Sequence, residues 1–173
     1  GDRGVTALMV CAYRGHYEWA KRLIMLGANK DITTVKCCDI CNFNLGNTAL
    51  MWAVQQNHLE IVKLLIDSHC DVNKSNHKGW TPLMLAASSG HTAIALYLVL
   101  HGALIDGQAT EDNWTALSMA VFAGHLEIVE ALVNAGCDLE VSSKACCTSI
   151  RCHNVGKTPL IMAASQGHTD IVD

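Results

Sequence analysis

Cysteine and histidine gather in two short segments of this chain, where they could act as zinc ligands. The chemistry rests on thiolate and imidazole, which are common Zn²⁺ ligands, and on a Cys-x-x-Cys spacing in the first segment that occurs in many zinc sites. The first segment holds Cys37, Cys38 and Cys41, and the second holds Cys146, Cys147, Cys152 and His153. Zinc bound at one or both segments is therefore one hypothesis for what they do.

Two alternatives to zinc stay open for these segments. The first segment has three obvious ligands where a structural site needs four, so it would have to borrow Asp39 or His77. The two segments lie three repeating units apart, which at about 10 Å per packed layer is about 30 Å, so we do not expect them to share one ion. We favour plain loop insertions with free thiols and no cofactor, and a disulfide within or between molecules is the third possibility.

Other histidines and a neighbouring Cys-His pair could suggest catalysis, but a structural role explains them better. Gly or Asn followed by histidine recurs at a fixed place in five similar segments, at His16, His58, His91, His125 and His168. A residue that recurs at one place in a repeat is expected to stabilise a turn. Cys152 and His153 are neighbours in a loop, and such neighbours rarely have the supported geometry of a nucleophile and its base. We find no phosphate-binding glycine loop and no paired carboxylates, so we predict that the chain is not an enzyme.

The elements that hold these residues belong to a repeat. Threonines at positions 6, 48, 81, 115 and 158 each begin a Thr-x-Leu motif, and they are spaced 42, 33, 34 and 43 residues apart. Threonine is a good helix N-cap, and Pro82 and Pro159 suit the first helical position. After the Gly-His or Asn-His turn, apolar residues such as Ile61, Val62 and Leu65 have helical spacing. Each unit is therefore predicted to be a pair of short helices that must stack on its neighbours.

Charge and composition exclude some classes of partner. The chain of 173 residues has 12 basic and 16 acidic residues and a formal net charge of −4. Nucleic acid is an unexpected partner because phosphate binding needs clustered Lys and Arg. No apolar run is long enough for membrane insertion. Nine cysteines, an odd number, fit reduced thiols, so we expect a cytoplasmic location, with the nucleus as an alternative.

The repeat resembles the ankyrin family, whose signature is Thr-Pro-Leu-His-x-Ala at a period of 33. The segment from Gly46 to Asn73 resembles one ankyrin repeat closely. The resemblance implies an all-α solenoid of stacked antiparallel helix pairs with projecting finger loops. We place repeats at about 2–32, 46–78, 79–112, 113–140 and 156–173, with Cys-containing insertions at 33–45 and 141–155. Because neither end carries a recognisable polar cap, we expect further repeats to flank this piece.

The chain departs from the ankyrin pattern at three kinds of position. The histidine after Leu is replaced by Met9, Met51, Met84, Ser118 and Ile161, so we expect its bonds to be absent. His69 stands where a glycine should end the second helix. Asn113 replaces a loop glycine, but asparagine tolerates positive φ.

The resemblance also places a partner-binding surface on the concave face and the fingers. It exposes the residue before each Thr and the two residues before each Gly-His. We therefore predict binding of another protein, of unknown identity, through Tyr13, Arg14, Gln55, Gln56, Trp80, Ser88, Trp114 and Phe122. Aromatic residues on a nearly neutral face fit protein recognition. Packing between fingers is the alternative role for Trp80 and Trp114, whereas Trp19 and Trp52 are expected in the core. The competing function is metal binding or redox sensing by the two Cys segments.

Asn73 is a candidate modification site. It follows Asp71 and Val72 and lies eight residues after Leu65, which resembles the motif that an oxygen-dependent asparaginyl hydroxylase modifies in the family. The alternative is that the asparagine bonds within its turn, and the two interpretations are compatible.

Overall fold

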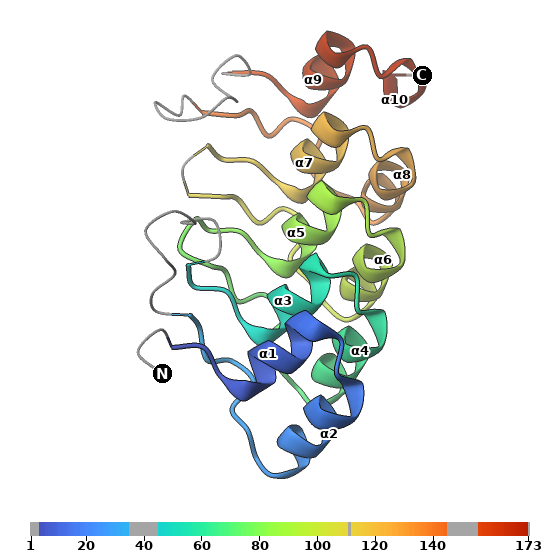
Figure 1. Cartoon of the computed structure of the whole chain (residues 1–173). Coiled ribbons are helices and arrows are strands. Elements are labelled where there is room, and N and C mark those ends of the chain that lie inside the picture. Colours follow the sequence, from blue (N-terminus) through green and yellow to red (C-terminus); the bar gives the residue numbers. More distant parts are fainter. Residues whose placement is uncertain (1–3, 35–44, 111, 145–155, 173) are drawn as a thin grey trace.

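The structure is a computed structural model, and it describes residues 4–34, 45–110, 112–144 and 156–172. All regular structure in these residues is helical, and the helices come in pairs (Figure 1). The inner helices of the pairs are α1 (Ala7–Arg14), α3 (Ala49–Gln55), α5 (Pro82–Ser89), α7 (Ala116–Ala123) and α9 (Pro159–Gln166). The outer helices are α2 (Tyr17–Met25), α4 (Leu59–Asp67), α6 (Thr92–Leu100), α8 (Leu126–Asn134) and α10 (Thr169–Val172). The predicted all-α solenoid is confirmed.

Each inner helix begins after a threonine, as the repeat predicts. The threonine hydroxyl accepts a hydrogen bond of 3.2 or 3.3 Å from the backbone N–H three residues on, in Thr6, Thr48, Thr81 and Thr115. This bond satisfies one of the backbone donors that a helix start leaves without a partner. Thr158 stands at the same position before α9, where no side-chain bond caps the helix.

The sulfur atom of methionine accepts a hydrogen bond at two helix starts, where we expected the bonds of the replaced histidine to be absent. The Sδ atoms of Met9 and Met84 lie 3.4 Å from the backbone nitrogens of Thr6 and Thr81, which donate to them. A thioether is a weak acceptor, but it completes a reciprocal pair of bonds at each of these two helix starts. The expectation that all such bonds are absent is therefore wrong at α1 and α5.

Histidine rings support the turns between paired helices. A Cβ atom built on Gly15 would lie 2.7 Å from Cε1 of His58, which belongs to the next pair. The same distance is 2.6 Å from Gly90 to His125. His58 also donates from Nε2 to the carbonyl oxygen of Tyr13 at 3.3 Å. Each ring thus packs against the preceding turn, which is the structural role predicted for the repeated histidines.

Left-handed backbone positions are mostly glycines, with three exceptions among the described residues. Asn57, His69 and Asn113 have φ values of 57°, 61° and 58°. Asparagine accepts this region more readily than most residues, and His69 stands where the other outer helices are followed by glycine. The irregular helix end predicted at His69 and the tolerant loop position predicted at Asn113 are both confirmed.

Stacking of the pairs forms the core. The inner helices pack in the order α1, α3, α5, α7 and α9, and the outer helices form a second row beside them (Figure 1). Leucines of the inner helices and isoleucines of the outer helices are buried between the rows, including Leu50, Leu83, Ile61 and Ile94. Small residues such as Ala86 and Ala120 are fully buried too, which allows neighbouring helices to approach closely.

The base of each finger is closed by two backbone hydrogen bonds, and these are the same in short and long fingers. In one of the two fingers without an insertion, Asn76 donates its N–H to the Trp80 carbonyl and accepts from the Gly79 N–H. The same two bonds bracket both insertions, between Thr34 and Gly46–Asn47 and between Ser143 and Gly156–Lys157, at 2.9 to 3.1 Å. The Cys segments therefore start and end on an unchanged finger base.

The two tryptophans expected in the core have different outcomes. Trp19 is 66% exposed, so its placement in the core is wrong. Its counterparts Ile61 and Ile128 are buried because a preceding pair covers them, and no preceding pair covers α2 among the described residues. Trp52 is half-buried and packs against the core, and its buried indole nitrogen has no partner in the described chain.

Candidate functional site

The last turn of each inner helix presents two side chains beside the turn that follows. We call these residues the inner-helix row, and it consists of Tyr13, Arg14, Gln55, Gln56, Ser88 and Phe122. Tyr13, Arg14 and Gln56 are exposed, and the other three are half-buried. Because α1, α3, α5 and α7 stack in that order, the structure brings these predicted residues onto one surface.

Aromatic packing fixes the two ends of the row. The Tyr13 ring meets Trp52 edge to face, with centroids 5.5 Å apart. The Phe122 ring meets Trp114 in a similar way, at 5.1 Å and an interplanar angle of 65°. Edge-to-face pairs add stabilisation beyond the area that they bury. The exposed ring of Tyr13 is therefore held by a partner from the next helix pair.

Trp80 and Trp114 occupy equivalent positions before Thr81 and Thr115 but differ in exposure. Trp80 is half-buried, and it remains available at the surface. Trp114 is only 1% exposed, so its predicted placement on the partner-binding surface is wrong. The reason is local packing, because Phe122 covers one side of the ring and the finger carrying Asp112 folds against its backbone. The alternative role in packing applies to Trp114.

A buried amide network connects the fingers to the inner-helix row. Asn76 donates from Nδ2 to Oδ1 of Asn47 at 3.0 Å, and Asn47 donates from its own Nδ2 to Oε1 of Gln55 at 3.3 Å. Asn76 also accepts from the backbone N–H groups of Lys78 and Trp80 at 3.0 Å. Sequence reasoning missed Asn76 and placed Asn47 at the surface, whereas Asn47 is fully buried.

Asn73 links two neighbouring fingers. Its Oδ1 accepts from the Leu104 N–H at 2.7 Å, and its Nδ2 donates to the Gly102 carbonyl at 3.0 Å. At the matching place, Asp31 accepts from the Asp71 N–H and Asp106 accepts from the Asp138 N–H, both at 2.9 Å. A carboxylate cannot donate, so only the asparagine makes both bonds. The side chain therefore bonds to the next finger rather than within its own turn.

Comparison with protein families agrees with the repeat and the stack of helix pairs. The model of ankyrin repeats matches in three copies, over residues 1–76, 68–143 and 108–173. The chain belongs to the ankyrin-repeat family. Ankyrin repeats generally mediate interactions between proteins, which is the coarse function of this array.

Curated relatives share parts of this ankyrin array. The chain is 36% identical over 96 residues to the mouse protein fem-1 homolog A-like, covering 56% of this chain and 13% of the relative. It is 44% identical over 68 residues to human protein phosphatase 1 regulatory subunit 27, covering 39% and 43%. The human Notch-regulated ankyrin repeat-containing protein is 42% identical over 65 residues, covering 34% and 57%. The chain thus spans less than two thirds of each of these relatives.

Buried thiols of the ankyrin array are packing residues. Cys11, Cys70 and Cys137 are unpaired and at most 9% exposed. Burial raises the pKa of all three thiols, and that of Cys70 reaches about 12. Because the thiolate is the reactive form, these groups are protonated and unreactive at neutral pH.

The proposed zinc ligands Cys37, Cys38, Cys41, Cys146, Cys147, Cys152 and His153 lie outside the described residues. Within residues 4–34, 45–110, 112–144 and 156–172, no three His, Cys, Asp or Glu side chains form a group that could hold a metal ion. A search of the same ranges finds no helix with the length and apolar character needed to span a bilayer.

Proposed function

We propose that this ankyrin array binds another protein through its concave face, formed by the inner-helix row, Trp80 and the finger bases. The observation that carries the proposal is the exposure of Tyr13, Arg14 and Gln56 at positions that repeat on successive stacked helices. A rigid array presents such residues in a fixed geometry, so little conformational entropy is lost when a partner binds.

The side chains of the inner-helix row favour a protein partner that offers both apolar and polar groups. Arg14 is its one charged residue, and rings and amides supply the remaining contacts. Tyrosine and arginine are enriched at binding hot spots because each offers a large contact area and directed hydrogen bonds. A row with one cation gives little attraction for the phosphates of a nucleic acid. Binding without catalysis, in the cytoplasm or nucleus, completes the proposal.

The test begins with identification of a partner by affinity capture from animal-cell lysate, followed by titration calorimetry on the purified pair. Tyr13→Ala and Trp80→Ala should each raise Kd by about fivefold or more, a loss above about 1 kcal/mol. Glu18→Gln on the outer helix α2 is the control, and it should leave Kd unchanged. If Glu18→Gln weakens binding while Tyr13→Ala and Trp80→Ala do not, the concave face is the wrong surface.

Trp114→Ala separates a binding role from a packing role. Removal of this buried ring should cost about 3 to 5 kcal/mol of stability. Trp80→Ala should leave the unfolding midpoint much closer to that of the unchanged chain. Equal losses of stability for both variants would place Trp80 among the packing residues.

Metal binding or redox sensing by the two Cys segments is a second candidate function. It is supported by the Cys38-x-x-Cys41 spacing and by the similar content of the two insertions. Metal analysis of chain purified under reducing conditions, without added zinc, tests it directly. About two zinc ions per chain would favour this function, since each segment needs its own site. A metal-free chain would remove metal binding from this function.

Hydroxylation of Asn73 is proposed as a modification of the same array. The two bonds from Asn73 to the next finger must open before an enzyme can reach the side chain, and the strained His69 close by makes that opening easier. Mass spectrometry of the Asn73 peptide from animal cells should show a gain of one oxygen. An unmodified peptide in cells that contain the hydroxylase would leave Asn73 as a structural residue alone.

A further inference from the structure

The outer helix α6 differs from its counterparts on the side that faces solvent. In α4 the exposed outer positions hold Glu60 and Asp67, and in α8 they hold Glu127 and Glu130. The matching positions of α6 hold Ala93, Leu96 and Leu100. Leu96 is 44% exposed and Leu100 is 80% exposed. We call these three residues the α6 outer patch.

The loss of polar groups is specific to this repeat. An outer helix normally has an apolar stripe toward the core and polar residues on the other side. α6 has the buried stripe, formed by Ile94, Ala95 and Leu98, and is apolar on its outer side as well. Leu104 continues the pattern at the start of the next finger, because it stands where Asp71 and Asp138 stand in the adjacent repeats. A helix that is apolar all round usually lies buried on all sides.

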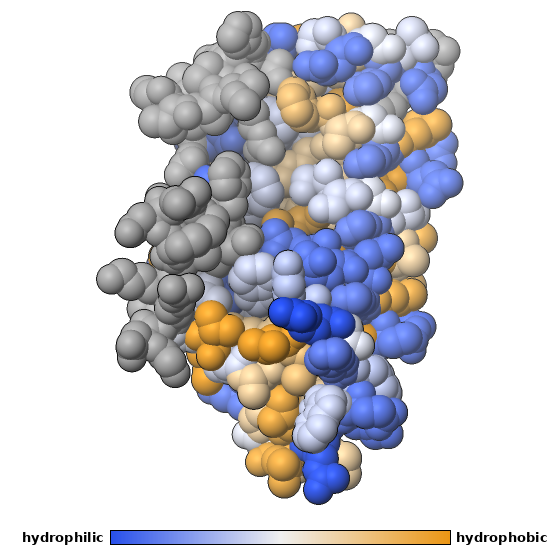
Figure 2. Space-filling view, in the orientation of Figure 1, coloured by the Kyte–Doolittle hydropathy of each residue, from blue (hydrophilic) through white to orange (hydrophobic). Residues whose placement is uncertain are grey.

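The α6 outer patch lies in the middle of the array, between α4 and α8 (Figure 1). In the space-filling view, apolar side chains interrupt the polar surface along the margin where the outer helices lie (Figure 2). Both neighbouring outer helices also contact other helices of the stack, so the patch is not an end surface awaiting another repeat.

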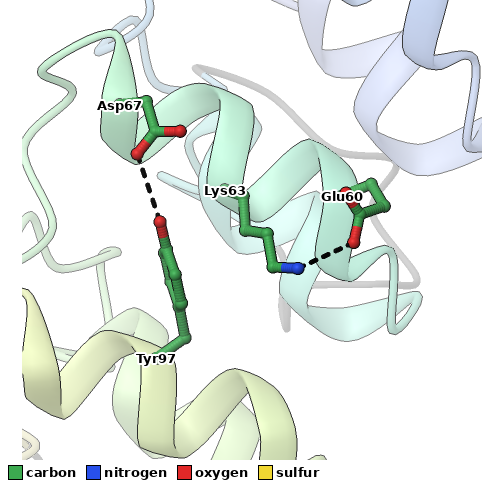
Figure 3. Close-up of polar contacts among 4 residues, drawn as sticks. All are labelled: Glu60, Lys63, Asp67 and Tyr97. Atoms are coloured by element: carbon green, nitrogen blue, oxygen red, sulfur yellow. Dashed lines mark hydrogen bonds and ion pairs between the residues drawn. The ribbon is translucent and has the colours of Figure 1, made fainter.

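Acidic side chains flank the patch. The matching outer positions of α4 and α8 hold the carboxylates Glu60, Asp67, Glu127 and Glu130 and the ammonium group of Lys63. Lys63 donates to Glu60 at 2.9 Å, so these two opposite charges offset each other (Figure 3). Asp67, Glu127 and Glu130 give the flanks their net negative charge. Asp67 accepts from the Tyr97 hydroxyl of α6 at 3.1 Å, and this neutral donor leaves the negative charge in place (Figure 3).

The aromatic edge of the patch is held in place. The His101 ring stacks on Tyr97, with centroids 4.0 Å apart, and His101 donates from Nδ1 to the Tyr97 carbonyl oxygen at 2.8 Å. Tyr97 in turn reaches Asp67 on α4. The boundary between α4 and α6 is therefore ordered, and the apolar side chains lie on a fixed support.

We propose that the α6 outer patch is a second docking site, which takes a basic amphipathic helix of a partner protein. Aliphatic side chains on one face of that helix cover Ala93, Leu96 and Leu100. Lysine or arginine on its flanks meets the carboxylates of α4 and α8. Aliphatic contact supplies affinity, and the complementary charges select a basic partner and set its orientation. The site lies on the outer row, so it works independently of the concave face.

The probe is a fluorescently labelled peptide of about 18 residues, long enough to form a helix on the surface. It has leucines at helical spacing and lysines on both flanks, and a second peptide carries glutamates in place of the lysines. Fluorescence anisotropy should show binding of the lysine peptide that weakens with added salt. The glutamate peptide should bind at least tenfold more weakly.

The decisive variant restores the polar residues that α4 has at the same positions, Leu96→Lys together with Leu100→Asp. Both side chains are exposed, so helicity by circular dichroism should stay the same while the Kd of the lysine peptide rises at least tenfold. Met25→Asp is the matched control, since Met25 is an exposed residue at the position of Leu100 in α2. This control should leave the Kd of the lysine peptide unchanged.

Three results would overturn the proposal. The first is equal affinity of the lysine peptide for the unchanged chain and for Leu96→Lys/Leu100→Asp. The second is self-association in sedimentation that this double variant abolishes, which would assign the patch to a second copy of the chain. The third is binding to vesicles of anionic and neutral lipid that the double variant removes, which would assign it to a membrane surface.

Discussion

The turns after α1 and after α3 connect helices in the same way but use different residues. In the first turn, Gly15 has no Cβ, and the His58 ring packs against it and bonds to the Tyr13 carbonyl. In the second turn, Asn57 takes the left-handed position with φ 57°, and the ring that follows is His91. Nε2 of His91 is buried and has no partner in the described chain. Asn57 carries a Cβ at the position where Gly15 has none, so we expect the His91 ring to pack less closely on its turn than the His58 ring does.

The second helix pair therefore combines two strained positions, Asn57 and His69. The same pair also makes side-chain links to its neighbours. Asn73 bonds twice to the third finger, and Asn76 joins Asn47 in a buried amide network. These links are placed where they could offset the backbone strain of the second pair. Substitutions at four positions can test the backbone strain and the bonds between fingers separately.

The largest loss of stability is expected when the left-handed turn position of the third helix pair is given a Cβ, as the second pair has at Asn57. In Gly90→Ala, the new Cβ would lie 2.6 Å from the His125 ring at a φ of 73°. Strain and clash together should cost about 2 to 3 kcal/mol in urea unfolding. Gly102→Ala is the control, because it has the same strain with nothing within 4 Å of its Cβ, and it should cost about 1 kcal/mol. Equal losses for the two variants would show that the histidine packing contributes nothing.

The next effect concerns the links between fingers. Asn73→Ala removes both bonds to the third finger and should cost about 1 to 2 kcal/mol of stability. Asn73→Asp keeps the acceptor for the Leu104 N–H but cannot donate to the Gly102 carbonyl. Its loss should be intermediate, as judged by thermal unfolding. An unfolding midpoint that stays the same in both variants would show that these bonds do not offset the strain.

Relief of strain at the end of α4 should stabilise the array. His69→Gly replaces a histidine at φ 61° by the residue that ends the other outer helices, at Gly27, Gly102 and Gly136. We expect a gain of about 1 kcal/mol in urea unfolding. Ser68→Gly, one residue earlier in ordinary backbone, is the control and should destabilise. A loss at His69→Gly would mean that the histidine side chain itself makes a favourable contact.

The smallest effect is expected at the second turn. Asn57→Gly should add about 0.5 kcal/mol, since asparagine is already tolerant of this backbone region. The change should also let the His91 ring bond as His58 does. Protection of the His91 ring proton from solvent exchange, measured by NMR, should rise in the variant. Unchanged protection would assign the unpaired nitrogen to a cause other than Asn57.

Local signals in the sequence were enough to predict the helices, their caps and their turns. Thr-x-Leu motifs, prolines at helix starts and left-handed glycines act within a few residues, so they can be identified without knowledge of the stack. Burial depends on neighbours far along the chain. Trp114 and Trp19 were misplaced because packing by Phe122, and the presence or absence of a covering pair, cannot be inferred from one repeat.

The cross-repeat contacts were harder to predict than the elements. No motif marks Asn47 and Asn76 as partners, since they meet only after two fingers stack. The α6 outer patch, by contrast, does have a signal in the sequence. Alignment of the outer helices with one another reveals aliphatic residues in α6 where its neighbours have charges.

The finger base, with its two backbone bonds, makes the array a modular display scaffold. Thr34 and Ser143 close the same pair of bonds as Asn76, although their fingers are about ten residues longer. Loop-closure entropy grows slowly, at about 0.6 kcal/mol for each doubling of length, so a longer tip costs little. Sequence at residues 35–44 or 145–155 can therefore vary under separate selection, and foreign peptides can be grafted there, without a change in how the helices stack.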